Sequence, residues 1–351
     1  AALIAGYAGA ASAQNSVTLY GVVSTGFKYE SAKANSNAET RSSFGMDTGQ
    51  WSGSRWGLRG VEDLGNGLKA SFVLESGFNS VNGTQGQSRT NDDGTKTDRL
   101  FGRQATVALE SASWGKVQLG RAVTPSTVAF SGIDPFGASF GTSSYTSSSG
   151  QTFYRVDNMV SYATPSISGF SAVIGYSFNP ALGTNSADAG FETNNKNRLV
   201  STGLRYANGP ILVAGIFDYL YSNNANTGGT AIDKINNDTN VKAWQVGGTY
   251  DFKVAKLHAA YGQEIDGLIG GADAIANLIV EGGSGETGGG ATFARGVRSQ
   301  SWLVGVSAPI GSGSLAVGVQ QQRPGGDLKT ANTANQTVAS VAYTYNLSKR
   351  T

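Results

Sequence analysis

Charged side chains alternate with apolar ones in the segment SRWGLRGVEDLGNGLKASFVLES, residues 54–76. The charged positions that keep this alternation are Arg55, Arg59, Lys69 and Glu75. Because successive side chains of a β-strand point to opposite faces, a period of two predicts a hairpin with its charge on one face. Fixed charge that meets water attracts or repels passing ions, and rings of such charge set the selectivity of pores.

The opposite face of this hairpin is apolar, and it faces either a protein core or lipid. Its large side chains are Trp56, Leu58, Phe72 and Leu74. A soluble hairpin would bury them, whereas a transmembrane barrel would turn them to lipid and leave the arginines in a water-filled lumen. A lipid-facing arginine at mid-depth costs about 2–4 kcal/mol, so in a barrel Arg55 and Arg59 face the lumen.

The composition favours the barrel. Charged residues make up 14% of the 351 residues, and 50 of the 351 residues are glycine. Soluble domains carry about 25% charged residues. No apolar run reaches the roughly 18 residues of a transmembrane helix. Low charge without long apolar runs is typical of alternating barrel strands.

Connections of two lengths alternate along the chain. Short turns rich in Gly, Pro, Asn and Ser, such as 62–67 and 309–314, alternate with long polar segments. Antiparallel membrane barrels sort their connections in this way, whereas a soluble sandwich has no reason to do so. The long segment before residue 296 contains DAIANLIV, which is compatible with a short helix or an extra strand.

We therefore expect an all-β protein, a transmembrane antiparallel barrel with about 14 strands present. The expected strands lie near residues 17–29, 54–61, 68–77, 99–109, 116–122, 155–163, 169–178, 197–206, 211–221, 240–250, 256–264, 298–308, 314–322 and 336–346.

The first residues have the pattern of a processed leader. An alanine-rich apolar run ends in Ala11-Ser12-Ala13, a small-x-small cleavage pattern, so 1–13 is interpreted as a signal-peptide remnant and 14–351 as the barrel. Cysteine is absent, which excludes disulfides and Cys-ligated metals. A net charge of +2, with Lys and Arg scattered, gives no indication of nucleic-acid binding.

Four segments together resemble the general porins of Gram-negative bacteria, and their beta-proteobacterial branch in particular. They are SVTLYGVVSTGF (16–27), SRWGLRGVEDLGNGLKASFVLESGF (54–78), LFGRQATVALES…WGKVQLGR (100–121) and YNLSKRT (345–351). The resemblance implies a 16-stranded barrel, forming a homotrimer in the outer membrane among lipid and lipopolysaccharide. The chain stops before the last two strands of that pattern, so we expect its first and last strands to be incompletely paired.

The resemblance also implies that the third long loop, about 122–154, folds into the lumen. This loop contains SGIDPFGASFGTSSYTSSSG, in which Asp134 precedes a Pro-Phe-Gly piece suited to a turn. Small and turn-forming residues favour a compact constriction loop, and a disordered external loop is the alternative.

Two further arginines enter the predicted constriction through the resemblance. Alternation does not decide which face of the sheet Arg103 occupies, because the apolar Ala105 and Val107 share its parity. The resemblance places Arg103 on the pore wall and Arg155 in a basic cluster opposite the acidic loop. The complete predicted constriction set is Arg55, Arg59, Lys69, Glu75, Arg103, Asp134 and Arg155, with general solubility of the lumen as the alternative for each arginine.

Enzymatic chemistry finds little support. His258 is the only histidine, and it alternates with Leu257 and Ala259, which places it in the lumen. No Ser-His-acid spacing is visible, and the segment 91–98 lacks the spacing of a calcium loop. We expect no catalytic residue, no metal and no cofactor.

The sequence thus favours a passive diffusion pore for ions and small hydrophilic solutes, with a mild preference for anions. A substrate-specific channel, which would show aromatic side chains along the lumen, is one alternative. A surface adhesin or receptor that uses the long loops on a plugged barrel is another.

Overall fold

The computed structural model describes most of the chain. The described residues are 16–32, 41–87, 89–90, 96–97, 99–137, 139–140, 143–145, 155–178, 180, 198–221, 240–269, 291–326 and 335–348. The interpreted leader 1–13 and the segment DAIANLIV lie outside them. Within the described part, no helix has the length and apolar character needed to cross a membrane.

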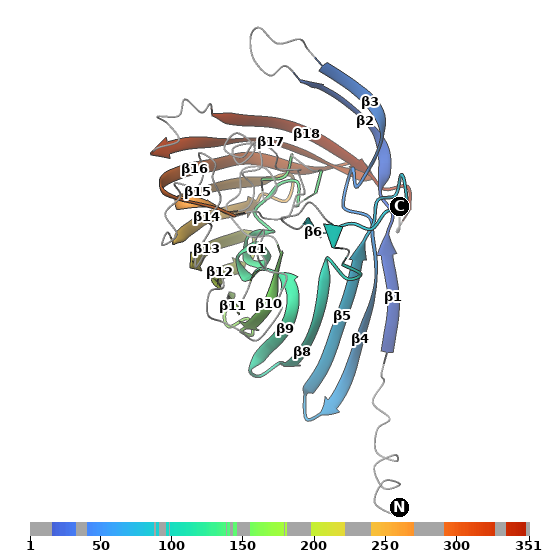
Figure 1. The fold of residues 1–351 in the computed structure, drawn as a ribbon, viewed down its shortest axis with the longest axis vertical. Helices are drawn as coiled ribbons and strands as arrows, with labels where there is room; N and C mark the ends of the chain where they lie inside the picture. The colour runs from blue at the N-terminus through green and yellow to red at the C-terminus, as the bar shows by residue number, and fades with distance from the viewer. Residues whose placement is uncertain are drawn as a thin grey trace, which may run out of the picture.

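A single sheet of 14 strands dominates the structure, and each strand pairs antiparallel with the next one in the sheet (Figure 1). Its strands are β1 (Ser16–Val22), β4 (Arg55–Gly65), β5 (Leu68–Gly77), β8 (Gln104–Ser111), β9 (Gly115–Val123), β10 (Arg155–Ala163), β11 (Phe170–Ser177), β12 (Arg198–Asn208), β13 (Ile211–Tyr221), β14 (Val241–Asp251), β15 (Lys256–Ile269), β16 (Ala291–Ile310), β17 (Gly313–Gly326) and β18 (Gln336–Tyr345). The expected all-β antiparallel architecture is confirmed. β1 and β18 are the two ends of the sheet, and no ladder between described residues joins them.

Four short strands lie outside this sheet. β2 (Thr25–Ala32) pairs with β3 (Arg41–Thr48), and β6 (Arg89–Thr90) pairs with β7 (Lys96–Thr97). One short helix, α1 (Pro125–Phe130), lies on the concave side of the sheet (Figure 1). It begins at the cap Thr124, whose side chain accepts a hydrogen bond from Thr127 N, and Pro125 at its start loses no helical hydrogen bond.

The register separates the two faces of the sheet. On the outer face, Val107 is 54% and Leu119 is 47% exposed, and the two are direct partners. Their inward-facing neighbours Thr106 and Ala108 are 7% and 3% exposed. Leu58 pairs with Leu74, and Gly60 with Phe72, which itself pairs with Val107. The apolar face of the first hairpin is therefore the outer face, as the barrel interpretation predicted.

The strand boundaries differ from the sequence prediction at several places, and β15 and β17 also end later than predicted, at Ile269 and Gly326. The predicted strand 17–29 is interrupted at Ser24, where β1 leaves the sheet and the chain continues as β2. β8 begins at Gln104 rather than near 99, which leaves 99–103 outside the ladder. β16 begins at Ala291 rather than near 298, because β15 continues to Ile269 and pairs with the backbone of 291–293, which the sequence assigned to a loop.

Candidate functional site

The segment 124–145 lies against the inner face of the sheet. Ser126 of α1 donates its backbone N–H to Ser201 Oγ at 3.1 Å and its hydroxyl to Asp218 Oδ2 at 2.8 Å. Ser201 and Asp218 come from β12 and β13 and are fully buried. The start of the segment is therefore fixed to the wall by a charge-assisted hydrogen bond in a dry environment.

The later part of the segment is fixed to more distant strands. The carbonyl of Ile133 lies 2.9 Å from His258 Nδ1 on β15, whose Nε2 lies 2.9 Å from Ser307 Oγ. Tyr145 Oη lies 2.7 Å from Ser301 Oγ on β16. Burial raises the pKa of the Tyr145 hydroxyl, so it stays protonated as a hydrogen-bonding group.

Glycines on the wall let this segment approach closely. A Cβ at Gly247 would stand 2.8 Å from both Ile133 and Phe130, and one at Gly305 would stand 2.7 Å from Pro135. A Cβ at Gly203 would overlap Ala129. Real Cβ atoms do not approach other atoms so closely, so these positions require glycine for packing rather than for backbone conformation. We name Gly203, Gly247 and Gly305 the glycine seat.

Asp134 stabilises the turn that follows α1. Its Oδ1 accepts a hydrogen bond from Phe136 N at 2.9 Å, and its Oδ2 accepts one from Ser144 Oγ at 2.6 Å. The Pro-Phe-Gly piece forms a turn closed by Gly137 N donating to Asp134 O at 3.0 Å. The side chain is 3% exposed, so its carboxylate is directed into the segment rather than toward the opposite wall.

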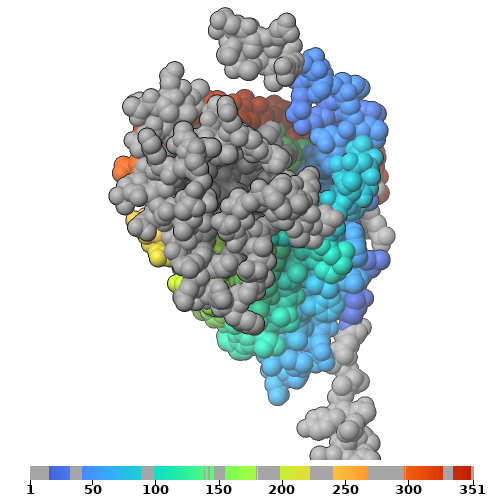
Figure 2. All heavy atoms as spheres, viewed as in Figure 1, coloured from blue at the N-terminus to red at the C-terminus, as the bar shows by residue number. Residues whose placement is uncertain are grey.

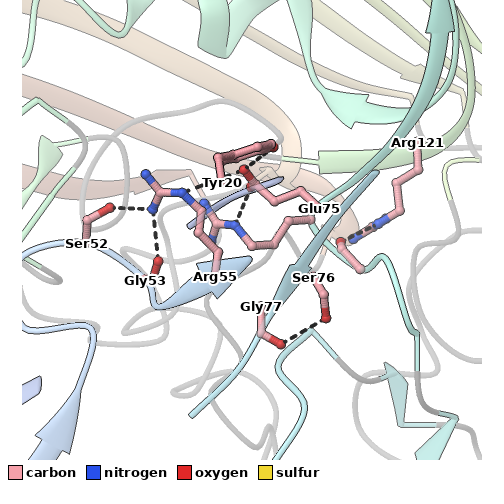
Figure 3. Close-up of polar contacts among 10 residues, drawn as sticks. Tyr20, Ser52, Gly53, Arg55, Glu75, Ser76, Gly77 and Arg121 are labelled. Atoms are coloured by element: carbon pink, nitrogen blue, oxygen red, sulfur yellow. Dashed lines mark hydrogen bonds and ion pairs between the residues drawn. The ribbon is translucent and has the colours of Figure 1, made fainter. Parts of the chain in front are cut away.

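A compact charged cluster surrounds Glu75 on the inner face of the sheet, at β4 and β5. Arg103 Nε donates to Glu75 Oε1 at 2.6 Å, and Arg55 Nε lies 3.6 Å from Oε2. Tyr20 Oη donates to Oε2 at 2.9 Å (Figure 3). Arg55 also donates to Ser52 Oγ and Gly53 O, both at 2.9 Å. β1, β4, β5 and the residue before β8 thus position one carboxylate among two guanidinium groups.

Arg59 extends this cluster along β4. Its guanidinium lies 5.4 Å from the centre of the Tyr20 ring. The hydroxyl of the same Tyr20 donates a hydrogen bond to Glu75. Arg59 pairs in register with Thr18 and Val73 on the inner face. The cluster of Arg55, Arg59 and Arg103 around Glu75 is named the basic cluster.

Lys69 lies apart from the basic cluster. It pairs with Asp63 and Glu110 near the short turns, in a row of alternating charge that Lys116 continues, 3.8 Å from Glu110. Glu75 lies six positions after Lys69 on β5, which is about 20 Å along an extended strand. The structure therefore separates Lys69 from the predicted partners at the constriction.

The position of Arg103 explains why alternation did not decide its direction. It precedes β8, so its side chain is not bound to the alternation of that strand, and its backbone N–H donates to Glu75 O at 3.1 Å. Arg155 is the first residue of β10, pairs with Val123 and is 9% exposed. Its predicted role in the constriction stays a prediction.

A second ionic cluster was missed from the sequence. Asp157 accepts hydrogen bonds from Arg99 Nη2 at 2.7 Å and from Arg121 Nη1 at 2.6 Å. Arg121 also donates to Gly102 O at 2.7 Å. Arg121 follows the parity of the outward Leu119, and Asp157 lies at a bulge beside Asn158, whose φ is 53°. This cluster braces the segment before β8 against β9 and β10.

Comparison with known proteins gives consistent matches. A family model described as Gram-negative porin matches residues 1–351. An outer membrane porin protein of Bordetella pertussis is 45% identical over 370 residues, which covers 100% of this chain and 90% of that protein. Outer membrane porin protein 32 of Delftia acidovorans is 32% identical and covers 98% of this chain and 83% of its own length. The solved anion-selective porin from Comamonas acidovorans is 26% identical with a TM-score of 0.66, over 96% of this chain and 86% of that chain.

Proposed function

Because the chain belongs to the Gram-negative porin family, we propose that its basic cluster gives an outer-membrane diffusion pore a mild preference for anions. The protein is a porin of the outer membrane, and its pore passes ions and small hydrophilic solutes by diffusion. Porins are channels, and no energy source is needed for such passage.

The single observation that carries the selectivity is the charge balance of the basic cluster. The guanidinium groups of Arg55 and Arg103 lie against the one carboxylate of Glu75, and that of Arg59 lies over the ring of Tyr20, which donates to the same carboxylate. One positive charge cancels against Glu75, and the excess acts on the lumen. A narrow passage with walls of low dielectric constant focuses such a field, which raises the local concentration of anions. The solved Comamonas relative is described as anion-selective, which supports the sign.

The segment 124–145 acts as the constriction in this proposal. Its hydrogen bonds to Ser201, Asp218 and Ser301 fix it to β12, β13 and β16, and Phe140 N donates to Trp51 O at 2.8 Å, close to the basic cluster. The basic cluster lies on β4, on β5 and just before β8, so solutes pass between this segment, whose single carboxylate is the buried Asp134, and a positively charged wall. Asp134 contributes to the shape of the segment, and Arg155 adds to the basic side at its edge.

The assembly belongs to the same proposal. We expect three copies to associate in the membrane, as the resemblance to general porins implies, with lipopolysaccharide in the surrounding leaflet. Each copy forms its own pore.

Planar-bilayer recording tests this function. The full protein is inserted into a bilayer, and the reversal potential is measured in a KCl gradient. Discrete ohmic steps with a reversal potential of the sign expected for chloride preference support the proposal. Absence of conductance steps contradicts the diffusion pore, and a reversal potential of the opposite sign contradicts the role of the basic cluster.

A further inference from the structure

Three cations lie on the outer face of the strands β14, β16 and β17. Lys242 is exposed between the fully buried Val241 and Ala243, so its side chain points away from the lumen. Arg298 and Arg323 are also exposed, and each of them lies next to a buried residue of its own strand. We name Lys242, Arg298 and Arg323 the outer cation patch.

The register brings these cations close together. Lys242 pairs with Ile265 on β15, and Ile265 pairs with Arg298 on β16. Arg298 pairs with Gly325, which lies two positions after Arg323 on β17. The Cα atoms of Lys242 and Arg298 are therefore about 10 Å apart, and those of Arg298 and Arg323 about 8 Å. Side chains of this length can reach one anionic group from these positions.

The outer cation patch has no carboxylate partner among the described residues. None of its members takes part in an ion pair there. Asp266 follows Ile265 at a bulge of β15, and its Oδ1 accepts a hydrogen bond from Gly296 N at 3.2 Å. Arg323 Nε donates to the neutral side chain of Gln321. The patch therefore carries positive charge that no described carboxylate pairs.

Aromatic side chains mark the level of the patch in the membrane. Trp244 lies two positions after Lys242, and its ring centre is 5.7 Å from that of Tyr261 on β15. Trp302 lies four positions after Arg298 on the same outer face. Tryptophan and tyrosine gather where the bilayer meets water. The patch lies just beyond these rings, toward the ends of the strands that the long connections join.

The height of the patch agrees with this level. Arg298 lies twelve positions before Ile310, where β16 ends at a short turn. With a rise of about 3.3 Å per residue and a strand tilt of roughly 40°, Arg298 stands about 30 Å above that turn. Arg323 lies ten positions after Gly313, the first residue of β17, and stands about 25 Å above the same turn. The apolar band of such a barrel is about 25 Å tall, so both arginines reach the headgroup layer.

We infer that the outer cation patch binds the phosphate groups of lipopolysaccharide. The long connections of an outer-membrane barrel lie on the extracellular side, so the patch meets the outer leaflet. Guanidinium groups hold phosphate through paired, charge-assisted hydrogen bonds, and a lysine adds a compact charge. The inference deepens the proposed function, from which it takes lipopolysaccharide as the surrounding lipid.

The outer cation patch is remote from the basic cluster. β14 and β15 lie at the left of the views in Figures 1 and 2, and β4 and β5 lie at the right. The patch also points away from the lumen. Replacing its charges is therefore expected to leave the conductance and the reversal potential unchanged, which separates a failure of this inference from a failure of the proposed pore.

Binding of lipid A, the phosphorylated anchor of lipopolysaccharide, tests the inference. The refolded full chain is titrated with bisphosphorylated lipid A in detergent, and bound lipid is counted by native mass spectrometry. Chelator is present, so that bridging divalent ions contribute nothing. The patch variant is Lys242→Gln/Arg298→Gln/Arg323→Gln. The matched control removes three cations near the short turns and is Lys116→Gln/Lys253→Gln/Lys256→Gln.

The patch variant is expected to bind lipid A about a hundredfold more weakly than the parent, and Arg298→Gln alone about fivefold. The control is expected to bind as the parent does. Conductance steps like those of the parent show that each variant has folded. Equal affinity of the parent and the patch variant, or an equal loss in the control, would overturn the inference.

Three further probes identify the source of the phosphate. Lipid A without phosphate, inorganic phosphate and vesicles of phosphatidylglycerol are each expected to bind the parent more weakly than bisphosphorylated lipid A does. Unchanged binding of the phosphate-free lipid would contradict phosphate recognition. Equally tight binding of inorganic phosphate or phosphatidylglycerol would contradict lipopolysaccharide as the ligand. Absence of conductance in the parent would count against the proposed pore and leave the patch standing.

Discussion

The two inner walls of the barrel are built from opposite kinds of residue. On β4 and β5, long charged side chains reach away from the backbone, and Arg55 and Arg103 meet at Glu75. On the wall from β12 to β16, glycines stand where side chains would be, and Gly203, Gly247 and Gly305 leave room for another stretch of backbone. The wall at β4 and β5 directs its charges toward the lumen, whereas the segment 124–145 covers the wall from β12 to β16.

This difference separates two properties of the pore. The basic cluster governs the sign of the ions that pass, because its charges act through the lumen. The glycine seat governs the cross-section, because it decides how far the segment stands from the wall. Variants on one wall are therefore expected to change one property and leave the other unchanged.

The largest effect is expected at the glycine seat. Gly247→Val places a branched side chain where a Cβ alone would stand 2.8 Å from Ile133 and Phe130. Overpacking of this kind costs about 1–3 kcal/mol of unfolding free energy, and the segment is expected to shift into the lumen and lower the single-channel conductance. The control is Gly215→Val on β13, since no atom lies within 4 Å of a Cβ there. Equal conductance of the two variants would contradict the seat.

Charge removal at the basic cluster is expected to give the next largest effect. Arg103→Gln removes the guanidinium that donates to Glu75 at 2.6 Å and reduces the excess of positive charge. The reversal potential in a salt gradient is expected to move toward that of a non-selective pore. High salt is expected to diminish the difference from the parent, because mobile ions screen the field. An unchanged reversal potential would place the selectivity filter elsewhere.

A smaller effect is expected from one anchor of the segment. Tyr145→Phe removes the hydroxyl that lies 2.7 Å from Ser301 Oγ at a site where both residues are fully buried. Loss of such a hydrogen bond costs about 1–3 kcal/mol, since Ser301 is left without this partner. Urea unfolding of the refolded protein measures the change, with Tyr345→Phe at an exposed position as the control. Equal midpoints would show that Tyr145 is not an anchor.

The smallest effect is expected at Lys69. It lies among the charges near the short turns, about 20 Å along β5 from Glu75. Lys69→Gln is therefore expected to shift the reversal potential far less than Arg103→Gln in the same bilayer system. A shift of equal size would extend the basic cluster to the short-turn rim.

Alternation predicted most of the fold and three of the four residues of the basic cluster. Arg55, Arg59 and Glu75 lie within regular strands, so their parity against Leu58 and Leu74 was sufficient to place them on the inner face. Parity gave no answer for Arg103, because that residue precedes the first ladder position of β8. Asp157 escaped notice because the bulge at Asn158 changes the local direction of side chains.

The glycine seat could not be predicted for a different reason. A glycine in a strand indicates close approach of some other group but does not identify it. Gly203 and Gly247 meet residues more than 70 positions away, in a segment whose path depends on tertiary hydrogen bonds. The burial of Asp134 depends on the same path, since its partner Ser144 comes from the other end of the turn. Neither the glycine contacts nor the contact between Asp134 and Ser144 can be predicted from neighbouring residues in the sequence.

The division between the two walls is tested most directly by recording two properties of two variants. Reversal potential and exclusion of neutral polymers of graded size are measured for Arg103→Gln and Gly247→Val in the same bilayers. Arg103→Gln is expected to shift the reversal potential and leave the polymer cut-off unchanged, and Gly247→Val is expected to lower the cut-off and keep the sign of the reversal potential. Loss of anion preference in Gly247→Val together with an unchanged cut-off would contradict the account.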